Sequence, residues 1–397
     1  MVYLRIHGEL DCEQAEIIPE APIWRIRFRL KMEFAIIRIP VCRYGGTRMH
    51  ANWNVFLHNA GAIVKDGMVQ HFGDPDVERQ AAAKSTVLAD LSSRSLIRAR
   101  GNDVKDFLQG QLTNDISLVD AAHSTISAYC NSKGRMLAIF RIFMREQTFL
   151  LELPLSMRDT IMQRLRLYIL RANVTLDSAD DELQRLGIAG PQAEAILRQE
   201  LGHALEKDDD SCSISDDVTL IRVRGHQPRF EVMAPAQVAQ ELWRQFRGRA
   251  TAVGAPVWAW LDIEAGIPNV YPETSEAFVP QMANLELVGG VSFDKGCYVG
   301  QEIIARIQSL GRLKQRMYRL HAMVDTIPQR GEAIYAPNLL GQSSGSVVDA
   351  QPSPDGGYDM LAVVHISSAK AGELYLGRER GPQLTVQALP YPLTSAQ

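Results

Sequence analysis

One cysteine of the sequence stands in a setting that suits sulfur chemistry. The stretch FDKGCYVGQE, residues 293–302, places Cys297 between two glycines, with Lys295 two residues before it. The run VSF predicts the end of a strand, and the run QEIIARI that begins at Gln301 predicts a helix. The positive end of such a helix, together with Lys295, favours the thiolate, which attacks electrophiles and binds iron. The same pattern also suits a small buried cysteine in a tight glycine turn, and the residues alone leave the two interpretations equal.

The composition restricts the class of protein. Hydrophobic residues make up 46% of the 397 residues and charged residues 22%, which is typical of a globular chain. The net charge of -4 provides no overall positive field, so direct nucleic-acid binding is not favoured. Five cysteines without a CxxC pair argue against a disulfide framework and a structural zinc or cluster site, and we predict no bound metal. No apolar run approaches the roughly 20 residues of a membrane span, and no signal peptide is recognisable. We therefore expect a cytoplasmic protein that does not bind membranes.

Several common catalytic motifs are absent from the sequence. It contains no GxxxxGKS/T phosphate loop, no GxGxxG fingerprint and no HExxH pair. These absences disfavour ATP hydrolysis, classical dinucleotide binding and zinc proteolysis.

The first 48 residues differ in composition from the rest. Their run WRIRFRLK, residues 24–31, alternates apolar residues with cations, so its four cations share one face of a predicted basic strand. Such an arm suits an anionic surface or nucleic acid. The simpler interpretation is an appendage or an upstream start codon, with Met49 as the native start. We expect residues 1–48 to be a basic extension that is non-native or disordered.

Two segments share a layout that indicates an internal repeat. FLLELPLSMRDTIMQRLRLY, residues 149–168, and FEVMAPAQVAQELWRQF, residues 230–246, each combine an alternating strand, a proline and an amphipathic helix. The run GNDVKDFLQGQL, residues 101–112, predicts a further helix that is capped by Asn102 or Asp103 and ends at Gly110.

These patterns predict an α+β protein with three domains after the extension. We expect an α+β domain at 49–145, a second α+β domain with the repeated units and the KGCYVGQE motif at 146–311, and a C-terminal domain at 312–397. In the last range, short strands alternate with Gly, Pro and Ser turns, which predicts a small β-barrel.

The run GVSFDKGCYVGQEIIAR, residues 290–306, resembles the signature of the YgfZ family of folate-binding proteins. The fixed positions of the family's Lys-Gly-Cys-Tyr-x-Gly-Gln-Glu motif are matched by Lys295, Gly296, Cys297, Tyr298, Gly300, Gln301 and Glu302. The likeness extends from about Met49 to Leu393 through VLADLS, FLQGQLTND, YCNSKGRMLA, IEAGIP, FVPQMANLE and LPYPL. The family is similar in fold to the T-protein of the glycine cleavage system, so the resemblance implies three domains in a ring around a folate pocket.

The resemblance implies a folate-binding accessory protein. Members of the family bind tetrahydrofolate and act in the assembly or maintenance of iron–sulfur clusters, on which tRNA-thiolating enzymes depend. We therefore expect tetrahydrofolate or a derivative as the cofactor, and iron–sulfur client or assembly proteins as partners. In this setting Cys297 is the candidate reactive thiol, with Lys295 beside it.

The resemblance also argues against a classical enzyme activity. The T-protein is an aminomethyltransferase whose catalytic aspartate lies in a Gly-Gly-x-x-Asp-Asp run. Ala138 and Ile139 stand at the acidic positions of this chain, and an aliphatic side chain cannot hold or relay a proton. A folate-dependent one-carbon enzyme is an alternative if Asp115 or Glu264 reaches the pocket instead. A nucleic-acid-binding module that uses the basic arm is a second alternative.

The resemblance further implies residues of the folate pocket. Trp258 matches a family tryptophan that lines the folate ring, eight residues before the glycine of the IEAGIP run, which also contains Glu264. A second family tryptophan is replaced by Arg94, whose guanidinium either stacks in its place or leaves a weaker folate site. Asp115 of the LTND run completes the candidate cofactor-binding residues. Core packing beside Trp260 is the other interpretation of Trp258.

Overall fold

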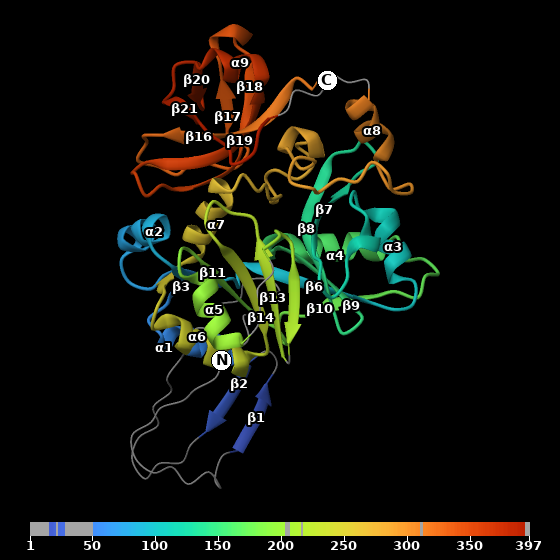
Figure 1. Ribbon diagram of the computed structural model, residues 1–397, viewed down its shortest axis with the longest axis vertical. Helices are drawn as coiled ribbons and strands as arrows, with labels where there is room; N and C mark the ends of the chain where they lie inside the picture. Colours follow the sequence, from blue (N-terminus) through green and yellow to red (C-terminus); the bar gives the residue numbers. More distant parts are fainter. Residues whose placement is uncertain are drawn as a thin grey trace. The chain divides into compact units, whose positions relative to one another are not determined.

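The structure of the chain is a computed structural model. It describes residues 51–202, 207–215, 217–309 and 313–393, together with the backbone of two strands nearer the N-terminus (Figure 1). The chain divides into two compact units, Met1–Thr47 and Arg48–Gln397. This division lies one residue from the boundary that the composition predicts.

In the first unit, two short strands form a hairpin. Strand β1 (Glu16–Glu20) pairs antiparallel with β2 (Ile23–Arg27). The strand predicted over 24–31 is therefore present through Arg27. The other expectations for residues 1–48 lie outside the described residues.

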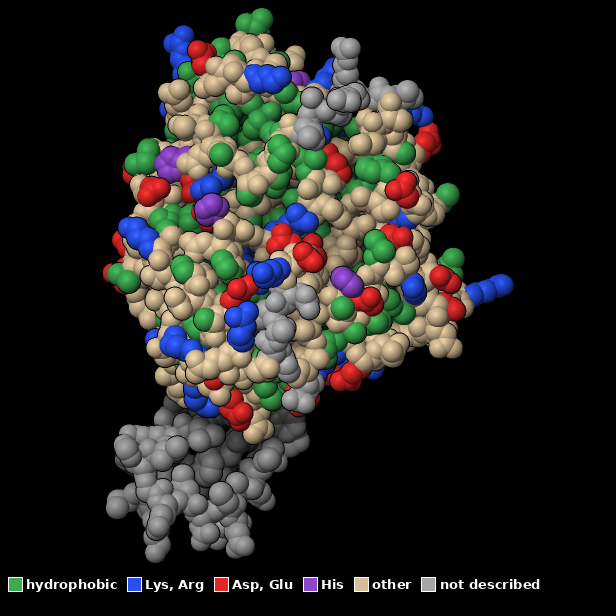
Figure 2. Space-filling view, viewed as in Figure 1, with side chains coloured by type: hydrophobic (Ala, Val, Ile, Leu, Met, Phe, Trp, Pro, Cys, Tyr) green, Lys and Arg blue, Asp and Glu red, His purple; other side chains and the backbone are tan. Residues whose placement is uncertain are grey.

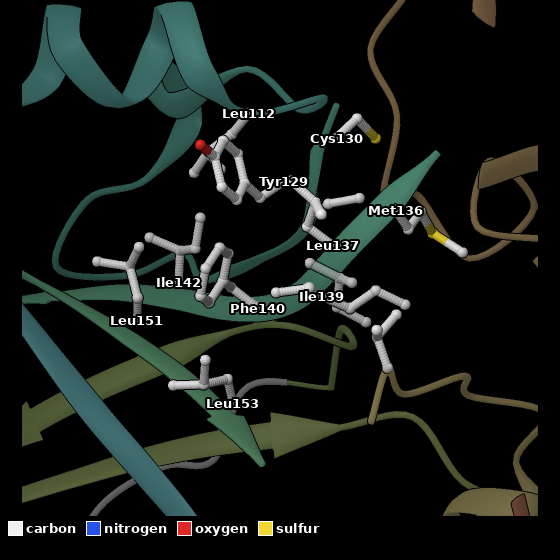
Figure 3. Close-up of a cluster of buried hydrophobic side chains, with 14 of the residues drawn as sticks. Leu112, Tyr129, Cys130, Met136, Leu137, Ile139, Phe140, Ile142, Leu151 and Leu153 are labelled. Atoms are coloured by element: carbon white, nitrogen blue, oxygen red, sulfur yellow. The ribbon is translucent and has the colours of Figure 1, made fainter. Parts of the chain in front are cut away.

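The first sheet of the second unit has five antiparallel strands in the order β10-β6-β9-β8-β7. In that order the strands span Thr175–Ser178, Arg94–Arg100, Thr148–Pro154, Met136–Arg145 and Thr125–Cys130. Side chains of β7, β8 and β9 form one hydrophobic cluster (Figure 3). Helices α3 (Val104–Gln111) and α4 (Arg158–Arg166) add their apolar faces to this cluster, so the inner strands are buried along nearly their whole length.

The second sheet has six strands in the order β12-β13-β14-β11-β5-β15, antiparallel except for β15 beside β5. In that order the strands span Cys212–Ser215, Val218–Val223, Arg229–Ala234, Gln184–Ala189, Val87–Asp90 and Thr251–Val253. Helix α6 (Ala236–Arg247) packs on β5, β11 and β14, and α5 (Ala193–Leu201) lies beside α6 (Figure 1). Helix α7 (Ala255–Glu264) joins this sheet to the C-terminal part, because it contacts β5 and also β18 and β19.

Smaller elements complete these two layers. They are α1 (Ala51–Asn59), the β3–β4 hairpin (Ile63–Lys65 and Met68–His71), α2 (Pro75–Lys84), α8 (Gln301–Ser309) and the 3-10 helices η2 (Ile116–Leu118), η3 (Leu155–Met157) and η4 (Pro280–Ala283).

The C-terminal part closes into a six-stranded barrel in the order β16-β19-β18-β17-β20-β21. In that order the strands span Gln315–Ala322, Tyr358–His365, Ser343–Pro352, Ala333–Tyr335, Leu374–Leu376 and Gln383–Gln387, with η5 (Pro337–Leu339) and α9 (Ile366–Ala371) between them in the chain. The predicted small barrel and the α+β class are both confirmed.

The domain boundary predicted at 145/146 is wrong. It falls in the turn between β8 and β9, which pair directly, with Arg145 opposite Thr148. Glu146 and Gln147 both have positive φ, 48° and 61°, as a tight two-residue hairpin requires. Glycine or asparagine normally marks such a turn, so Glu-Gln conceals it in the sequence. Strand β5 also joins the six-stranded sheet, so the range 49–145 contributes to both sheets.

The predicted repeat is confirmed at the level of layout. Strand β9 ends at Pro154 and is followed by η3 and α4, and β14 is followed by Pro235 and α6. The helix predicted over 101–112 is α3, but Gly110 lies inside it instead of ending it. Asp103 precedes the helix, yet its carboxylate accepts a hydrogen bond from the Asn173 amide at 2.7 Å and not from the helix. Among the described residues, no helix is both long and apolar enough to cross a bilayer.

A chain that starts at Met49 should melt at the same temperature as the full chain, because the core of the second unit begins in α1. Trp53 has no exposed surface, and its indole N–H donates to Asp90 at 2.8 Å. A chain that starts after α1 loses this tryptophan and should be less stable by roughly 3–5 kcal/mol, the scale of removing a buried aromatic side chain. Thermal unfolding of the three chains tests this. A lower melting temperature for the Met49 form would show that the extension stabilises the second unit.

Candidate functional site

A hollow opens where the two sheets of the second unit meet. The hollow is narrow and partly open to solvent, and the centres of water-sized molecules can occupy about 30 Å³ of it. Its walls come from β6, β7, β8 and β9 of one sheet, from the ends of β13 and β14 of the other, and from α7 and the loop after it. The apolar part of the wall includes Ile126, Ile139, Phe140, Leu153, Ile267 and Pro268. The charged part includes Arg94, Arg141, Glu152, Arg229, Glu231 and Asp262.

The charged side chains of the wall pair across the two sheets. Arg94 of β6 donates to Glu231 of β14 at 3.1 Å and also to Asp262 of α7. Arg229 of β14 donates to the other oxygen of Asp262 at 2.7 Å. Because Arg94 belongs to the first sheet and its partners belong to the second sheet and to α7, these ion pairs hold the two walls of the hollow together.

Glu152 is the least satisfied charged group of the wall. It is 2% exposed, and neither of its carboxylate oxygens accepts a hydrogen bond from a described residue. The nearest guanidinium nitrogen, Nη1 of Arg94, lies 3.6 Å from its Oε1. Burial, reinforced by the neighbouring Glu231, raises the pKa of Glu152 from its usual value of 4.5 to about 8. Buried carboxylate oxygens without donors are the expected sign of a ligand that supplies N–H groups.

Lys295 anchors the KGCYVGQE motif to the end of α3. Its ammonium donates to the carbonyl oxygens of Gln109, Leu112 and Asn114 at 2.7, 2.8 and 2.8 Å. The last carbonyls of a helix have no partner within the helix and carry partial negative charge, so an ammonium satisfies them. Burial lowers the pKa of Lys295 to about 8.

Hydrogen bonds of the LTND run, residues 112–115, connect Lys295 to the wall of the hollow. The side-chain amide of Asn114 donates to Ile126 O at 2.9 Å and to Gly289 O at 2.6 Å. The hydroxyl of Thr113 donates to Gly290 O at 2.7 Å. Because Ile126 lines the hollow, the segment before the motif is bonded to the same strand that forms part of the pocket.

The glycines of the motif have different roles. Gly300 has φ 83°, and a Cβ there would lie 2.5 Å from Asn131 O and 2.9 Å from the Cα of Gly134. Only glycine allows this close approach between the motif and the β7–β8 turn. A Cβ on Gly296 would meet nothing within 4 Å, so crowding does not explain glycine at that position.

Cys297 is exposed, whereas the other two described cysteines are buried. Burial raises the pKa of Cys212 to about 12 and also raises the pKa of Cys130, which lies in the cluster of Figure 3. Helix α8 begins at Gln301 as predicted, but residues 291–293 form no strand. The interpretation of Cys297 as a buried turn residue is therefore wrong. The prediction that Lys295 acts as a cation beside the thiol is also not supported, because its ammonium is held by α3.

The structure brings some of the predicted pocket residues together and not others. Arg94 lines the hollow, and so does Ile139, at one of the two positions where the resemblance expects an acid. Trp258 does not line it. Trp258 is 2% exposed. Its ring packs so closely on Gly187 that a Cβ at that glycine would lie 2.5 Å from the ring. The guanidinium carbon of Arg229 lies 4.7 Å from the ring centroid on the ring face. The stacking role predicted for Trp258 is thus corrected to core packing behind the wall.

The two acids predicted from the sequence also lie outside the wall. Asp115 caps η2 by accepting from the Ser117 amide at 2.9 Å, and Gln109 donates to the same carboxylate oxygen at 3.0 Å. These hydrogen bonds, with that to Ser117 dominant, lower the pKa of Asp115. Glu264, the last residue of α7, is not among the described residues that line the hollow.

The wall contains carboxylates that the sequence analysis missed. The carboxylates that line the hollow are those of Glu152, Glu231 and Asp262, whereas the sequence predicted Asp115 or Glu264. A signal was available, because Glu152 and Glu231 interrupt runs whose other residues are apolar and predicted to be buried.

Replacing Glu152 with Gln should change how stability depends on pH. In the folded protein Glu152 keeps its proton between about pH 4.5 and pH 8, whereas the unfolded chain releases it in this range. The wild-type protein should therefore lose stability as pH rises through this window, by up to a few kcal/mol, and Glu152→Gln should lose less. Thermal unfolding at both ends of the window measures this, with Glu264→Gln as the control. Parallel pH profiles for wild type and Glu152→Gln would contradict the assignment.

Replacing Lys295 with Met should destabilise the fold, because three carbonyls at the end of α3 lose their donor. We expect a loss of roughly 1.5–3 kcal/mol in the free energy of unfolding, the contribution of hydrogen bonds to a charged group. Lys133→Met, an exposed change on the β7–β8 turn, is the control. Urea unfolding reports both. Equal midpoints for Lys295→Met and wild type would mean that the anchor does not stabilise the motif.

Comparisons with known proteins agree with this architecture. The family described as the GCVT N-terminal domain matches residues 73–295. Proteins named "tRNA-modifying protein YgfZ" from Enterobacter sp. (strain 638) and Klebsiella pneumoniae (strain 342) are each 32% identical, over 327 and 326 residues, covering 81% of this chain and 98% of the relative. The crystal structure of glycine cleavage system aminomethyltransferase T from Bartonella henselae matches with a TM-score of 0.69 at 19% identity, over 84% of this chain and 95% of that one. The predicted T-protein-like fold is therefore confirmed, and the chain belongs to the YgfZ family.

Proposed function

We propose that this protein is a folate-binding accessory factor for the assembly or maintenance of iron–sulfur clusters in the cytoplasm, and that it supports tRNA modification through enzymes that depend on those clusters. The relatives from Enterobacter and Klebsiella, which are named as tRNA-modifying proteins, support the link to tRNA modification. The fold shared with an aminomethyltransferase supports a folate site in the hollow.

The unpaired carboxylate of Glu152 is the observation that carries the proposal. The pterin ring of a folate presents a ring N–H and an amino group side by side, and Glu152 can accept both in a bidentate pair once it releases its proton on binding. Glu152 has two oxygens without donors among the described residues, whereas Glu231 and Asp262 of the same wall are each bonded to an arginine. The side chains of Phe140 and Pro268 line the same hollow and offer apolar surface to a conjugated ring.

The same wall argues for binding without group transfer. Ile139 lines the hollow, and Ala138 beside it is fully buried, so neither position supplies a proton-transfer group. The alternative of a displaced catalytic acid is weakened, because Asp115 is used as a cap and Glu264 does not line the hollow. Of the three carboxylates that do line it, Glu231 and Asp262 are bound to arginines, and Glu152 is the one that we assign to the ring of the ligand.

A role in direct RNA binding has less support than the folate site. On the face shown in Figure 2, Lys and Arg side chains are interspersed with Asp and Glu instead of gathering by sign. Arg316, one of several cations near the start of the barrel, is buried against Glu286. Cys297, by contrast, offers an exposed thiol on an anchored loop, as chemistry on iron or sulfur requires.

A folate titration tests the hollow. Tetrahydrofolate should bind the wild-type protein, and Glu152→Gln should weaken binding by roughly tenfold or more, about 1.4 kcal/mol, because the glutamine amide places a donor against the ring donors. Glu264→Gln should bind like wild type. Calorimetry measures both. Equal affinity for wild type and Glu152→Gln would remove Glu152 from the folate site, and no binding by wild type would refute the folate function.

Complementation of a deletion strain tests the thiol in the same set of variants. Cys297→Ser should fold and bind folate like wild type but should lose support of client iron–sulfur enzymes, since a hydroxyl is a weak iron ligand and is not ionised at neutral pH. The activity of those enzymes in cell extracts is the readout. Full client activity with a well-expressed serine variant would show that sulfur chemistry at this position is not needed.

A further inference from the structure

The turn after α4 exposes three large apolar side chains within four residues. The exposed fractions are 74% for Leu167, 47% for Tyr168 and 88% for Leu170. Single exposed apolar residues are ordinary on protein surfaces, whereas a contiguous group of them marks an interaction site. We call residues 164–171 the α4 turn.

The backbone of the α4 turn is held in a conformation that does not suit its sequence. Leu170 has φ 48°, in the left-handed region that favours Gly or Asn over a bulky residue. The turn is fixed at its far end, because the Asn173 amide donates to Asp103 at 2.7 Å and a Cβ on Gly101 would clash with Asn173 O. The side chain of Leu170 gains nothing from burial, so folding does not explain leucine at this position. A strained residue that packs against nothing points to a role outside folding.

The α4 turn is also positively charged. Residues 160–174 contain three arginines and no Asp or Glu. Arg166 and Arg171 are exposed, although Arg166 also donates to Leu176 O at 2.5 Å. Arg164 interacts with Glu276 at 3.8 Å and with the hydroxyl of Tyr129. Arginine, tyrosine and exposed aliphatic side chains side by side are the composition of protein–protein hot spots.

We propose that the α4 turn is a docking surface for a partner protein whose contact segment carries Asp or Glu beside apolar side chains. Its arginines complement the carboxylates, and Leu167, Tyr168 and Leu170 supply the apolar contact. Aliphatic leucines offer no surface on which bases stack, so the composition favours a protein over single-stranded RNA. None of these residues lines the hollow or belongs to the KGCYVGQE motif, so the proposal does not rest on the folate function.

Two matched synthetic peptides test the charge of the partner. Each is an amphipathic helix of about 18 residues, five helical turns, with leucines at the same positions and either glutamates or lysines at the others. Fluorescence anisotropy with the full-length protein should show that the glutamate peptide binds roughly tenfold more tightly or better than the lysine peptide, and that added salt reduces the difference. A labelled single-stranded RNA is the third probe. Absence of binding by the glutamate peptide, or equal binding of the two peptides, would overturn the proposal.

Variants of the protein locate the contact. The double variant Leu167→Ser, Leu170→Asn should bind the glutamate peptide roughly tenfold or more weakly, because the apolar contact is lost, while its melting temperature stays equal or rises, because Asn tolerates positive φ. Leu340→Ser is the matched control, since Leu340 is 91% exposed and also has positive φ, 37°, but lies in the barrel. Unchanged affinity of the double variant for the glutamate peptide, or an equal loss in Leu340→Ser, would refute the surface. RNA binding that the double variant abolishes would assign the α4 turn to nucleic acid instead.

Discussion

A guanidinium inside the protein must be paired, and the pairing of Arg94 shapes the centre of this fold. Its side chain is 17% exposed, and an unpaired charge at that depth would be strongly destabilising. Its partners Glu231 and Asp262 come from the second sheet and from α7, so the pairing requires that the two sheets approach each other at this point. Glu152, on the strand next to Arg94, has two carboxylate oxygens that no donor among the described residues satisfies. The hollow is therefore formed by ion pairs, and one carboxylate in it is left for a ligand.

A second buried cation, Lys295, organises the motif at the surface. The ammonium binds the end of α3, and Gly300 packs against the β7–β8 turn. These contacts hold Lys295 before Cys297 and Gly300 after it against the protein, and the side chain of Cys297 between them stays exposed. The buried cysteines have the opposite setting, because a low-dielectric environment disfavours the thiolate. The motif thus presents a single sulfur on a loop that is anchored at both ends.

Hollow and thiol are connected through a short series of hydrogen bonds. Ile126 lines the hollow, its carbonyl accepts from Asn114, and the carbonyl of Asn114 accepts from Lys295, two residues before Cys297. This connection gives the proposed folate site a structural route to the motif loop. Ile139 stands in the wall at a position where the resemblance expects an acid.

The sequence by itself determined the local features of this protein, and the tertiary structure decided which distant residues meet. Hydrophobic periodicity was enough for the repeated strand–proline–helix units and the C-terminal barrel, because it depends only on neighbours in the chain. The KGCYVGQE motif was enough to identify the family and to single out Cys297 as the candidate reactive thiol, although it left the exposure of that thiol open. The turn at Glu146–Gln147 was missed because its positive φ is imposed by the strands on either side and not by the residues. Likewise, Trp258 and Glu264 were predicted from their place in a motif. In the structure Trp258 is buried under Arg229 and Glu264 is the last residue of α7, and neither is among the described residues that line the hollow. The pairs Arg94–Glu231, 137 residues apart, and Lys295–Gln109, 186 residues apart, follow from how the sheets pack, and no local pattern encodes them.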